Sequence, residues 1–216
     1  MAEAGVIVQA RMNSARVPGK VLRPLAGRPL LGHLLDRLRT LGLPVVVATS
    51  DDSSDDAIAS FCVAEGVAVH RGSLDDVAER FVGAAREYDV DPIVRVSGDS
   101  PLLDPALVRR ALALWEPGLL VTNVRPRTFP TGQSVEAFEL AALEGAELTD
   151  DAREHVTSTL YEQLRVQNFS HAPDLSHLRL TLDTDEDAVR LDALFARMER
   201  PPSDYSLAEL VELCSA

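Results

Sequence analysis

Short apolar runs rich in Val and Ile alternate with segments of helical periodicity through the first half of the chain, and this alternation narrows the fold more than any other feature. The runs expected to form strands cover residues 6–8, 45–47, 67–69 and 93–96. The segments expected to form helices cover residues 30–38, 55–64, 74–88 and 105–115. Strands that alternate with helices pair in parallel and are covered on both faces. The sequence therefore predicts an α/β fold with a mainly parallel sheet, and places the leucine stripe of residues 30–38 in its core.

The alternation of expected strands and helices is interrupted after an apolar run at residues 119–121, which is followed by a loop rich in Pro and Gly. The elements expected beyond it are a strand at 135–138, helices at 140–146 and 152–164, a strand at 178–182 and a helix that begins within 183–187. Asp104 is expected to cap the helix at 105–115, and Ser206 with Glu209 to form a capping box for the last helix. With 216 residues the chain can bury one complete core, so we expect a single domain over 1–216, with 124–170 as a small inserted lobe.

The charge balance limits the partners of the chain. Its 34 acidic and 21 basic residues give a net charge of −13, which disfavours binding to nucleic acid or to an anionic membrane, because both need a basic face. No apolar run approaches the roughly 20 residues that span a bilayer, and no signal segment is visible, so we expect a cytoplasmic protein. Cys62 and Cys214 lie far apart and indicate neither a disulfide framework nor a zinc site.

A cationic loop at residues 9–20 follows the first expected strand. Within it, Arg11, Arg16 and Lys20 stand among small residues and a Pro-Gly turn. The spacing is neither that of a Walker loop nor that of a dinucleotide-binding loop. A basic turn exposed to solvent is one interpretation. The other interpretation is a polyphosphate-binding loop, in which cations and backbone N–H groups point at a nucleoside triphosphate.

Two aspartates follow other expected strands. Asp99 follows the strand at 93–96 after Ser97 and Gly98, and Asp183 comes directly after the strand at 178–182. Ligands bind outside the carboxyl ends of strands in open α/β sheets, so both can meet the cationic loop. Carboxylate oxygens suit Mg²⁺, which usually keeps phosphate oxygens and water as further ligands. Either aspartate could instead serve only a turn or a helix start.

Together these groups fit attack on an α-phosphate with pyrophosphate as the leaving group. Mg²⁺ held by Asp99 and Asp183 and the charge of Lys20 would stabilise the phosphoryl oxygens, while Arg11 and Arg16 would hold the β- and γ-phosphates.

Several longer motifs are spread over the chain: Ile7-Val8-Gln9-Ala10-Arg11-Met12-Asn13-Ser14-Ala15-Arg16-Val17-Pro18-Gly19-Lys20, Val47-Ala48-Thr49-Ser50, Arg71-Gly72, Asp76-Val77, Arg80-Phe81, Gly98-Asp99, Thr122-Asn123, Arg153-Glu154-His155-Val156-Thr157 and Asp183-Thr184. By these motifs the chain resembles, over nearly its whole length, the cytidylyltransferases that activate acidic sugars, the 3-deoxy-manno-octulosonate and acylneuraminate enzymes, and above all their spore-coat polysaccharide branch. The resemblance implies a Rossmann-like three-layer α/β/α nucleotidyltransferase of GT-A-like type, CTP as donor, a small acidic sugar as acceptor, Mg²⁺ as cofactor and a homodimer.

The same resemblance assigns roles to individual residues. Asp99 and Asp183 receive the Mg²⁺, and together with Arg11 and Lys20 they form the catalytic set. The residues implied around the nucleotide are Gln9, Ala10, Arg11, Ser14, Arg16, Lys20, Arg80 and Ser97.

The chain departs from the branch in two places, at residues 133–134 and at residue 185. Gln133-Ser134 stands where Leu-Asp is usual, so a carboxylate that could serve the acceptor or the metal is absent, and Asp185 stands where Pro is usual. Arg127 and Phe129 lie in the expected lobe, either as contacts to the acceptor or as exposed loop residues.

Three further alternatives remain open. His155 is either a general base or a residue of structure or of a dimer contact. A second possibility is a GT-A glycosyltransferase that uses a nucleotide sugar. Such an enzyme would show an Asp-x-Asp motif, and Asp183-Thr184-Asp185, in the last fifth of this chain, has this pattern. A non-catalytic nucleotide-binding domain is the third possibility.

Overall fold

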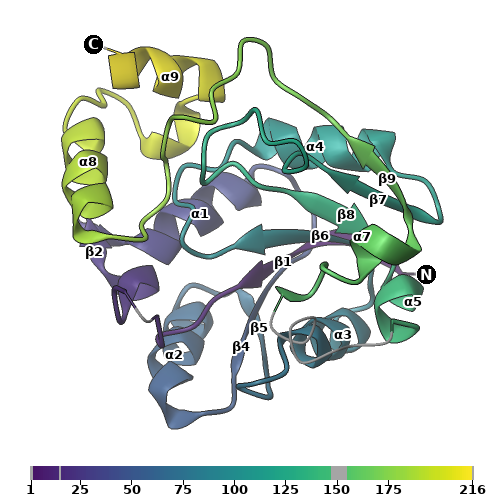
Figure 1. The fold of residues 1–216 in the computed structure, drawn as a ribbon. Coiled ribbons are helices and arrows are strands. Elements are labelled where there is room, and N and C mark those ends of the chain that lie inside the picture. Colours follow the sequence, from purple (N-terminus) through teal and green to yellow (C-terminus); the bar gives the residue numbers. More distant parts are fainter. Residues whose placement is uncertain (1, 15, 147–154, 216) are drawn as a thin grey trace.

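A computed structural model describes residues 2–14, 16–146 and 155–215. Its centre is a seven-stranded sheet in the order β5-β4-β1-β6-β8-β7-β9, in which only β8 runs against its neighbours (Figure 1). The strands are β1 (Glu3–Gln9), β4 (Val45–Ser50), β5 (Ala68–Gly72), β6 (Val90–Ser97), β7 (Leu119–Thr122), β8 (Glu136–Phe138) and β9 (Arg165–Asn168). The mainly parallel sheet expected from the sequence is confirmed.

Helices cover both faces of this sheet, as Figure 1 shows for α1 and α4 on one side and α3 on the other. The helices are α1 (Leu30–Arg39), α2 (Asp56–Ala64), α3 (Val77–Glu87), α4 (Pro105–Leu114), α5 (Leu140–Glu144), α7 (Leu160–Gln163), α8 (Asp185–Phe195) and α9 (Leu207–Ser215). Shorter elements are the 3-10 turns η1 (Lys20–Leu22), η2 (Ser53–Asp55) and η3 (Pro202–Asp204) and a hairpin of β2 (Pro24–Leu25) and β3 (Arg28–Pro29).

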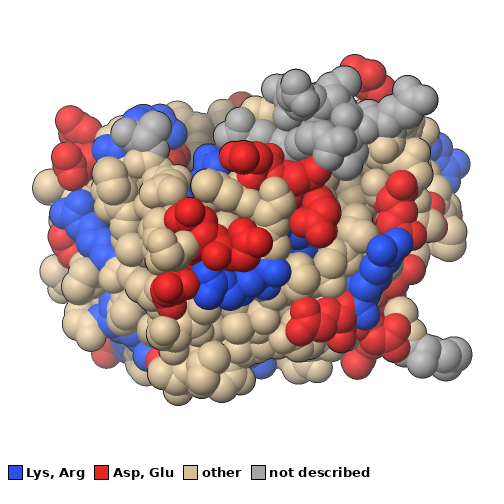
Figure 2. Space-filling model, turned by 90° about the horizontal axis from the view of Figure 1, so that it is seen from below, with Lys and Arg blue, Asp and Glu red and all other residues tan. Residues whose placement is uncertain are grey.

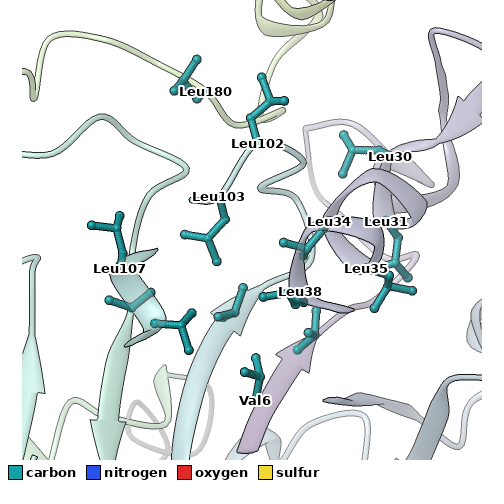
Figure 3. Packing of buried hydrophobic residues seen from close by; sticks show 14 of the residues in the cluster. Val6, Leu30, Leu31, Leu34, Leu35, Leu38, Leu102, Leu103, Leu107 and Leu180 are labelled. Carbon is teal, nitrogen blue, oxygen red and sulfur yellow. The ribbon is translucent and has the colours of Figure 1, made fainter. Parts of the chain in front are cut away.

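The core forms two clusters because successive residues of a strand point to opposite faces. Val6 and Val8 of β1 belong to the cluster under α1, α2, α4, α8 and α9, whereas Ile7 between them belongs to the cluster under α3, α5 and α7. The leucine stripe of α1 lies in the first cluster, beside Leu102, Leu103 and Leu107 (Figure 3). All three β1 residues are fully buried, which is typical of a strand inside a parallel sheet.

The predicted helix caps are present. The Asp104 carboxylate accepts a hydrogen bond from Ala106 N at 2.8 Å, and Pro105 takes the first helical position of α4. Ser206 N donates to Glu209 Oε2 at 2.8 Å, as a capping box requires. The helix predicted over 74–88 begins only at Val77, because Asp76 caps it by accepting from Glu79 N.

Two predictions about local structure were wrong, and one strand was not predicted. Residues 178–182 form no strand of the sheet, and Arg179 makes an isolated bridge with Thr131. The helix predicted over 152–164 is broken in its described part, where Val156 has φ +35° and α7 begins at Leu160. Strand β9 was missed, because its polar edge sequence lacks the apolar run of a buried strand.

The segment 124–170 contributes β8 and β9 to the main sheet, so its described part is continuous with the rest of the fold. The buried Arg37 ties the C-terminal elements to α1 and to the loop after β6 by donating to the carbonyl oxygens of Leu103, Pro202 and Tyr205. On the face drawn in Figure 2, described Lys and Arg side chains are bordered by acidic ones. Of the helices described here, none combines the length and the apolar character needed to cross a membrane.

Candidate active site

The cationic loop and Asp99 leave the same edge of the sheet because β1 and β6 are parallel neighbours. Gln9 pairs with Ser97 in the register of these strands, and Gly98 N donates to Gln9 O at 2.8 Å. A Cβ on Gly98 would lie 2.9 Å from that carbonyl oxygen, so only glycine allows this approach. The two strand ends therefore deliver their loops side by side.

A cavity of about 320 Å³, termed the first cavity, lies at these strand ends. The residues that line it are Gln9, Arg11, Ser14, Arg16, Lys20, Val21, Arg95, Ser97, Asp99 and Asp183. It brings together the three sequence segments from which the site was predicted.

Lys20 occupies the centre of the polar cluster in the first cavity. Its Nζ lies 2.6 Å from Asp99 Oδ2 and 2.7 Å from Asp183 Oδ1, and the three side chains are 12%, 17% and 19% exposed. Burial alone would lower the pKa of Lys20, but the two carboxylates outweigh it and raise the pKa above its usual value. Arg16 and Arg179 lie near Asp183 as well, at 3.4 and 3.5 Å.

A buried aspartate holds the cationic loop. Asp55 is fully buried and accepts hydrogen bonds from Met12 N at 2.7 Å, Ser50 N at 3.0 Å and the Ser50 hydroxyl at 2.5 Å. The loop closes at Gly19, which has φ +73° and donates its N–H to Met12 O at 2.8 Å. This anchoring fixes Met12 and Gly19, between which Ser14 and Arg16 lie.

Asp183 is fixed by contacts from two directions. Leu182 N and the Thr181 hydroxyl both donate to Asp99 O, at 3.1 and 3.0 Å, which ties the two aspartates together through the backbone. On the other side, Asp187 Oδ2 accepts from Asp183 N at 3.0 Å and Thr184 N at 3.1 Å as part of the capping box of α8. Asp183 therefore reaches the cavity without the strand that the sequence analysis expected before it.

Asp187 is itself buried, with 1% of its surface exposed, and stays ionised through its partners. Burial would raise the pKa of Asp187, but hydrogen bonds from Arg179 and Arg190 lower it well below its usual value. The Asp187 carboxylate at the start of α8 therefore has a structural role, because it orients the backbone that carries Asp183.

The residues predicted for the site fall into two groups. The predicted residues that line the first cavity are Gln9, Arg11, Ser14, Arg16, Lys20, Ser97, Asp99 and Asp183. Their chemical roles stay predictions. Ala15, Arg153 and Glu154 of the motifs lie outside the described residues.

Ala10 and Arg80 do not line the first cavity, and their expected place around the nucleotide stays a prediction. Ala10 is 2% exposed, and its side chain packs in the core. Arg80 is fully buried and donates Nη1 to the carbonyl oxygens of Ser73 and Leu74. It thus supports the 73–74 loop, and that loop reaches a smaller hollow lined by Arg11, Asn13, Leu74, Asp75 and Val77.

Other candidate residues have different surroundings. Asp185 is 86% exposed and pairs with Arg23 at 3.3 Å. The Asp183-Thr184-Asp185 sequence therefore places only the Asp183 carboxylate in the first cavity. Phe129 is buried in the core and stacks edge-on against Phe169, which excludes it as an exposed contact. Arg127 and His155 line a neighbouring cavity together with Glu136.

Sequence reasoning missed Arg95 and Val21 as lining residues. Arg95 was interpreted only as part of an apolar strand, yet it lies two residues before Ser97 and therefore on the same face of β6. Its Nη2 donates to Gln9 Oε1 at 3.2 Å. The available signal was the charge itself, since an arginine inside a buried Val-rich strand needs a polar partner.

Comparisons of the sequence and the fold with known proteins show which family this chain is similar to. The model of the family described as cytidylyltransferase matches residues 5–164. The chain is 36% identical to the spore coat polysaccharide biosynthesis protein SpsF of Bacillus subtilis, and the alignment covers 96% of this chain and 92% of that protein. It is 29% identical to the 3-deoxy-manno-octulosonate cytidylyltransferase of Rhodospirillum centenum, over 96% and 78% of the two chains.

Among solved structures, a cytidylyltransferase from Leptospira borgpetersenii has the same fold with a TM-score of 0.93 and 31% sequence identity. The superposition covers 100% of this chain and 94% of that one. The agreement extends over the whole sheet and both helical layers.

Proposed function

Because this chain belongs to the cytidylyltransferase family, we propose that it transfers CMP from CTP to an acidic sugar or a related small acid, with Mg²⁺ as cofactor and pyrophosphate as the second product. The observation that carries the proposal is the meeting of Asp99 and Asp183 at one cation beside the cationic loop. A triphosphate and a divalent cation both suit this arrangement of charges.

Mg²⁺ fits the donor atoms at this place. Asp99 and Asp183 offer hard carboxylate oxygens within reach of a single ammonium. Among the described residues no three His, Cys, Asp or Glu side chains gather in a metal-binding group. Mg²⁺ commonly binds through one or two carboxylates and takes its other ligands from phosphate and water, so two carboxylates are sufficient.

In the proposed reaction, a hydroxyl oxygen of the acceptor bonds to the α-phosphorus of CTP while the bond from that phosphorus to the bridging oxygen of the β-phosphate breaks. Pyrophosphate leaves, and the hydroxyl proton goes to solvent. Bound Mg²⁺ would supply Lewis-acid stabilisation of charge on the phosphoryl oxygens. Arg11 and Arg16 bind the β- and γ-phosphates, and Lys20 exchanges its carboxylate partners for phosphate oxygens.

The donor and the acceptor class rest on the relatives. The family model carries the name cytidylyltransferase, and the name of the Rhodospirillum centenum relative states an acidic sugar as its substrate. A homodimer is proposed on the earlier resemblance alone, and light scattering of the purified protein tests it.

The direct test is a screen of CTP, UTP, ATP and GTP against a panel of acidic sugars with Mg²⁺, with pyrophosphate release as the signal. Release with CTP and one acid supports the proposal, provided that omission of Mg²⁺ abolishes it. Nucleotide-dependent thermal shifts without release for any acid would favour a binding domain instead.

A further inference from the structure

A second cavity of about 420 Å³ lies beside the first, and Arg95 lines both. It lies between β8, the loop after β7 and the chain that leads into α7. Its other lining residues are Val124, Arg125, Arg127, Ser134, Glu136, His155, Thr157, Ser158 and Tyr161. A molecule held here is next to the cluster of Lys20, Asp99 and Asp183, which is where an acceptor for the proposed reaction has to be.

The charge of Glu136 is already balanced inside the wall of this cavity. Glu136 Oε2 accepts from Arg95 Nη1 at 2.6 Å and from the Thr157 hydroxyl at 3.0 Å, while Oε1 accepts from the Tyr161 hydroxyl at 2.6 Å. Its side chain is only 6% exposed. Among the described residues that line the second cavity, no other carboxylate is present.

Two further arginines line the cavity without a carboxylate partner in the described part of the chain. Arg127 is half-buried and donates Nη1 to the neutral Ser134 hydroxyl at 3.0 Å. Arg125 lies over the ring of Tyr161, with its Cζ 3.9 Å from the ring centre. Glu136 forms no ion pair with Arg127 but acts on it electrostatically: burial lowers the pKa of Arg127 more than the charge of Glu136 raises it, and the guanidinium remains protonated at neutral pH. The described lining of the second cavity is therefore locally cationic in a chain with a net charge of −13.

We propose that Arg127 is the specificity residue for the acceptor, and that its guanidinium binds the acceptor's carboxylate while Arg125 adds a second positive charge. This inference rests on the proposed function and deepens it by assigning the acid group of the acceptor to a particular side chain. A planar guanidinium matches a carboxylate in two parallel hydrogen bonds, so it fixes orientation as well as charge. The acceptor's hydroxyl is thereby turned toward the wall shared by the two cavities at Arg95.

The test measures acceptor binding by isothermal titration calorimetry, apart from turnover. The probes are 3-deoxy-manno-octulosonate, N-acetylneuraminate and the uncharged methyl ester of N-acetylneuraminate. Each is titrated into protein that is free or saturated with Mg²⁺ and an α,β-methylene analogue of CTP. At least one free acid should bind, and the ester should bind about 10- to 100-fold more weakly than its acid, because a hydrogen-bonded charge pair is lost.

Variants then locate the effect. Arg127→Met should weaken binding of the acid about 10- to 100-fold and leave the affinity for the ester unchanged, whereas Arg127→Lys should recover part of the loss. Ser134→Asp should weaken acid binding with the arginine intact, because it places a carboxylate on the existing partner of Arg127. Arg165→Met is the matched control, since Arg165 is 75% exposed on β9 and lines neither cavity.

Affinity of Arg127→Met for the acid equal to that of the wild type would overturn the inference, and so would equal binding of acid and ester, or no binding of either acid to the wild type. Loss of the preference for acid over ester in Arg127→Met alone supports it. Failure of the CTP analogue to bind is a different result: it counts against the proposed function, while acid binding to the nucleotide-free protein still decides the role of Arg127.

Discussion

Asp99 and Asp183 come from opposite halves of the chain, yet both accept a hydrogen bond from the same Lys20 ammonium, at 2.6 and 2.7 Å. The backbone reinforces this pairing, because Asp99 O accepts from Leu182 N and from the Thr181 hydroxyl. Two negative charges are therefore held close together before any ligand binds. Such preorganisation is what electrostatic catalysis at a phosphate requires.

Asp99→Asn and Asp183→Asn are predicted each to lower pyrophosphate release by about 10²-fold or more, because an amide binds a divalent cation poorly and removes charge at the reacting phosphate. Steady-state release with CTP and the acceptor from the screen measures this. The free energy of unfolding should change by only about 1 kcal/mol, since both side chains contact the cavity rather than the core.

Asp192→Asn is a suitable control for these two variants, because Asp192 lies on an exposed position of α8 and lines neither cavity. Turnover of Asp99→Asn at the wild-type rate would refute the metal role of that residue.

Lys20→Met is predicted to increase the affinity of the nucleotide-free protein for Mg²⁺ or Mn²⁺ by about tenfold or more. The reason is that the ammonium and a divalent cation compete for the same two carboxylates, and a change of about 1.4 kcal/mol suffices for tenfold. Calorimetric titration with Mn²⁺ measures this affinity without reference to turnover, which should itself fall. Unchanged metal affinity would mean that Lys20 does not compete for the metal site.

The Lys20 ammonium is also predicted to make the free energy of unfolding depend on pH. The pKa of Lys20 is raised above 10.5 in the folded state, so its contribution is complete below the unfolded value and is lost as the pH rises through the folded one. We therefore expect the difference in unfolding free energy between wild type and Lys20→Met to shrink in the alkaline range. Urea denaturation from pH 8 upward measures this difference, and a difference independent of pH would argue against the charge-based account.

Much of the sheet could be predicted from the sequence because its strands are buried on both faces and read as continuous apolar runs. β1 and β4 are of this kind, whereas the polar edge strand β9 gives no such signal. Residues 178–182 carry alternating leucines yet form no strand, because Leu178 and Leu180 bond to the loop at Thr131 rather than to a neighbouring strand.

The site was partly predictable for a different reason. Asp99 and Lys20 stand directly after strands or in the loop that follows one, so parallel pairing brings them together. The burial of Arg80 depends on the fold around the 73–74 loop, which a local motif does not encode. The partner of Arg95 was not predictable, because the register between β6 and β8 places it opposite Glu136, 41 residues further along the chain.

Asp187→Asn is predicted to lower the free energy of unfolding at neutral pH by about 1–3 kcal/mol, because a buried carboxylate loses its ionic bonds to Arg179 and Arg190. The pKa of Asp187 is lowered in the folded state, so this stabilisation is present above the unfolded value of 3.8 and is lost as the pH falls through the folded one. Denaturation curves at pH 7 and pH 3 measure the effect, and the two proteins should differ less at pH 3. A difference that grew toward low pH would contradict the assigned charge state.

Gly132→Ala is predicted to disturb the site from a distance, because Gly132 touches the segment that carries Asp183. A Cβ at this position would lie 2.5 Å from Leu180 O and 2.9 Å from Thr181 N, which are backbone atoms that cannot turn away. Thr181 in turn donates to Asp99 O, so a shift of this segment moves Asp183 relative to Asp99.

Gly118→Ala is the control that separates the effect of the Gly132 contact from the effect of backbone strain. Gly118 has φ +80° and Gly132 has φ +94°, but a Cβ on Gly118 meets no atom within 4 Å. Gly118→Ala should therefore cost only the strain of about 1–2 kcal/mol and keep turnover, while Gly132→Ala should cost at least about 2 kcal/mol more and lower turnover. Urea denaturation and pyrophosphate release on the two variants measure both effects. Equal stability and equal turnover for the pair would show that the contact between Gly132 and Leu180 does not position Asp183.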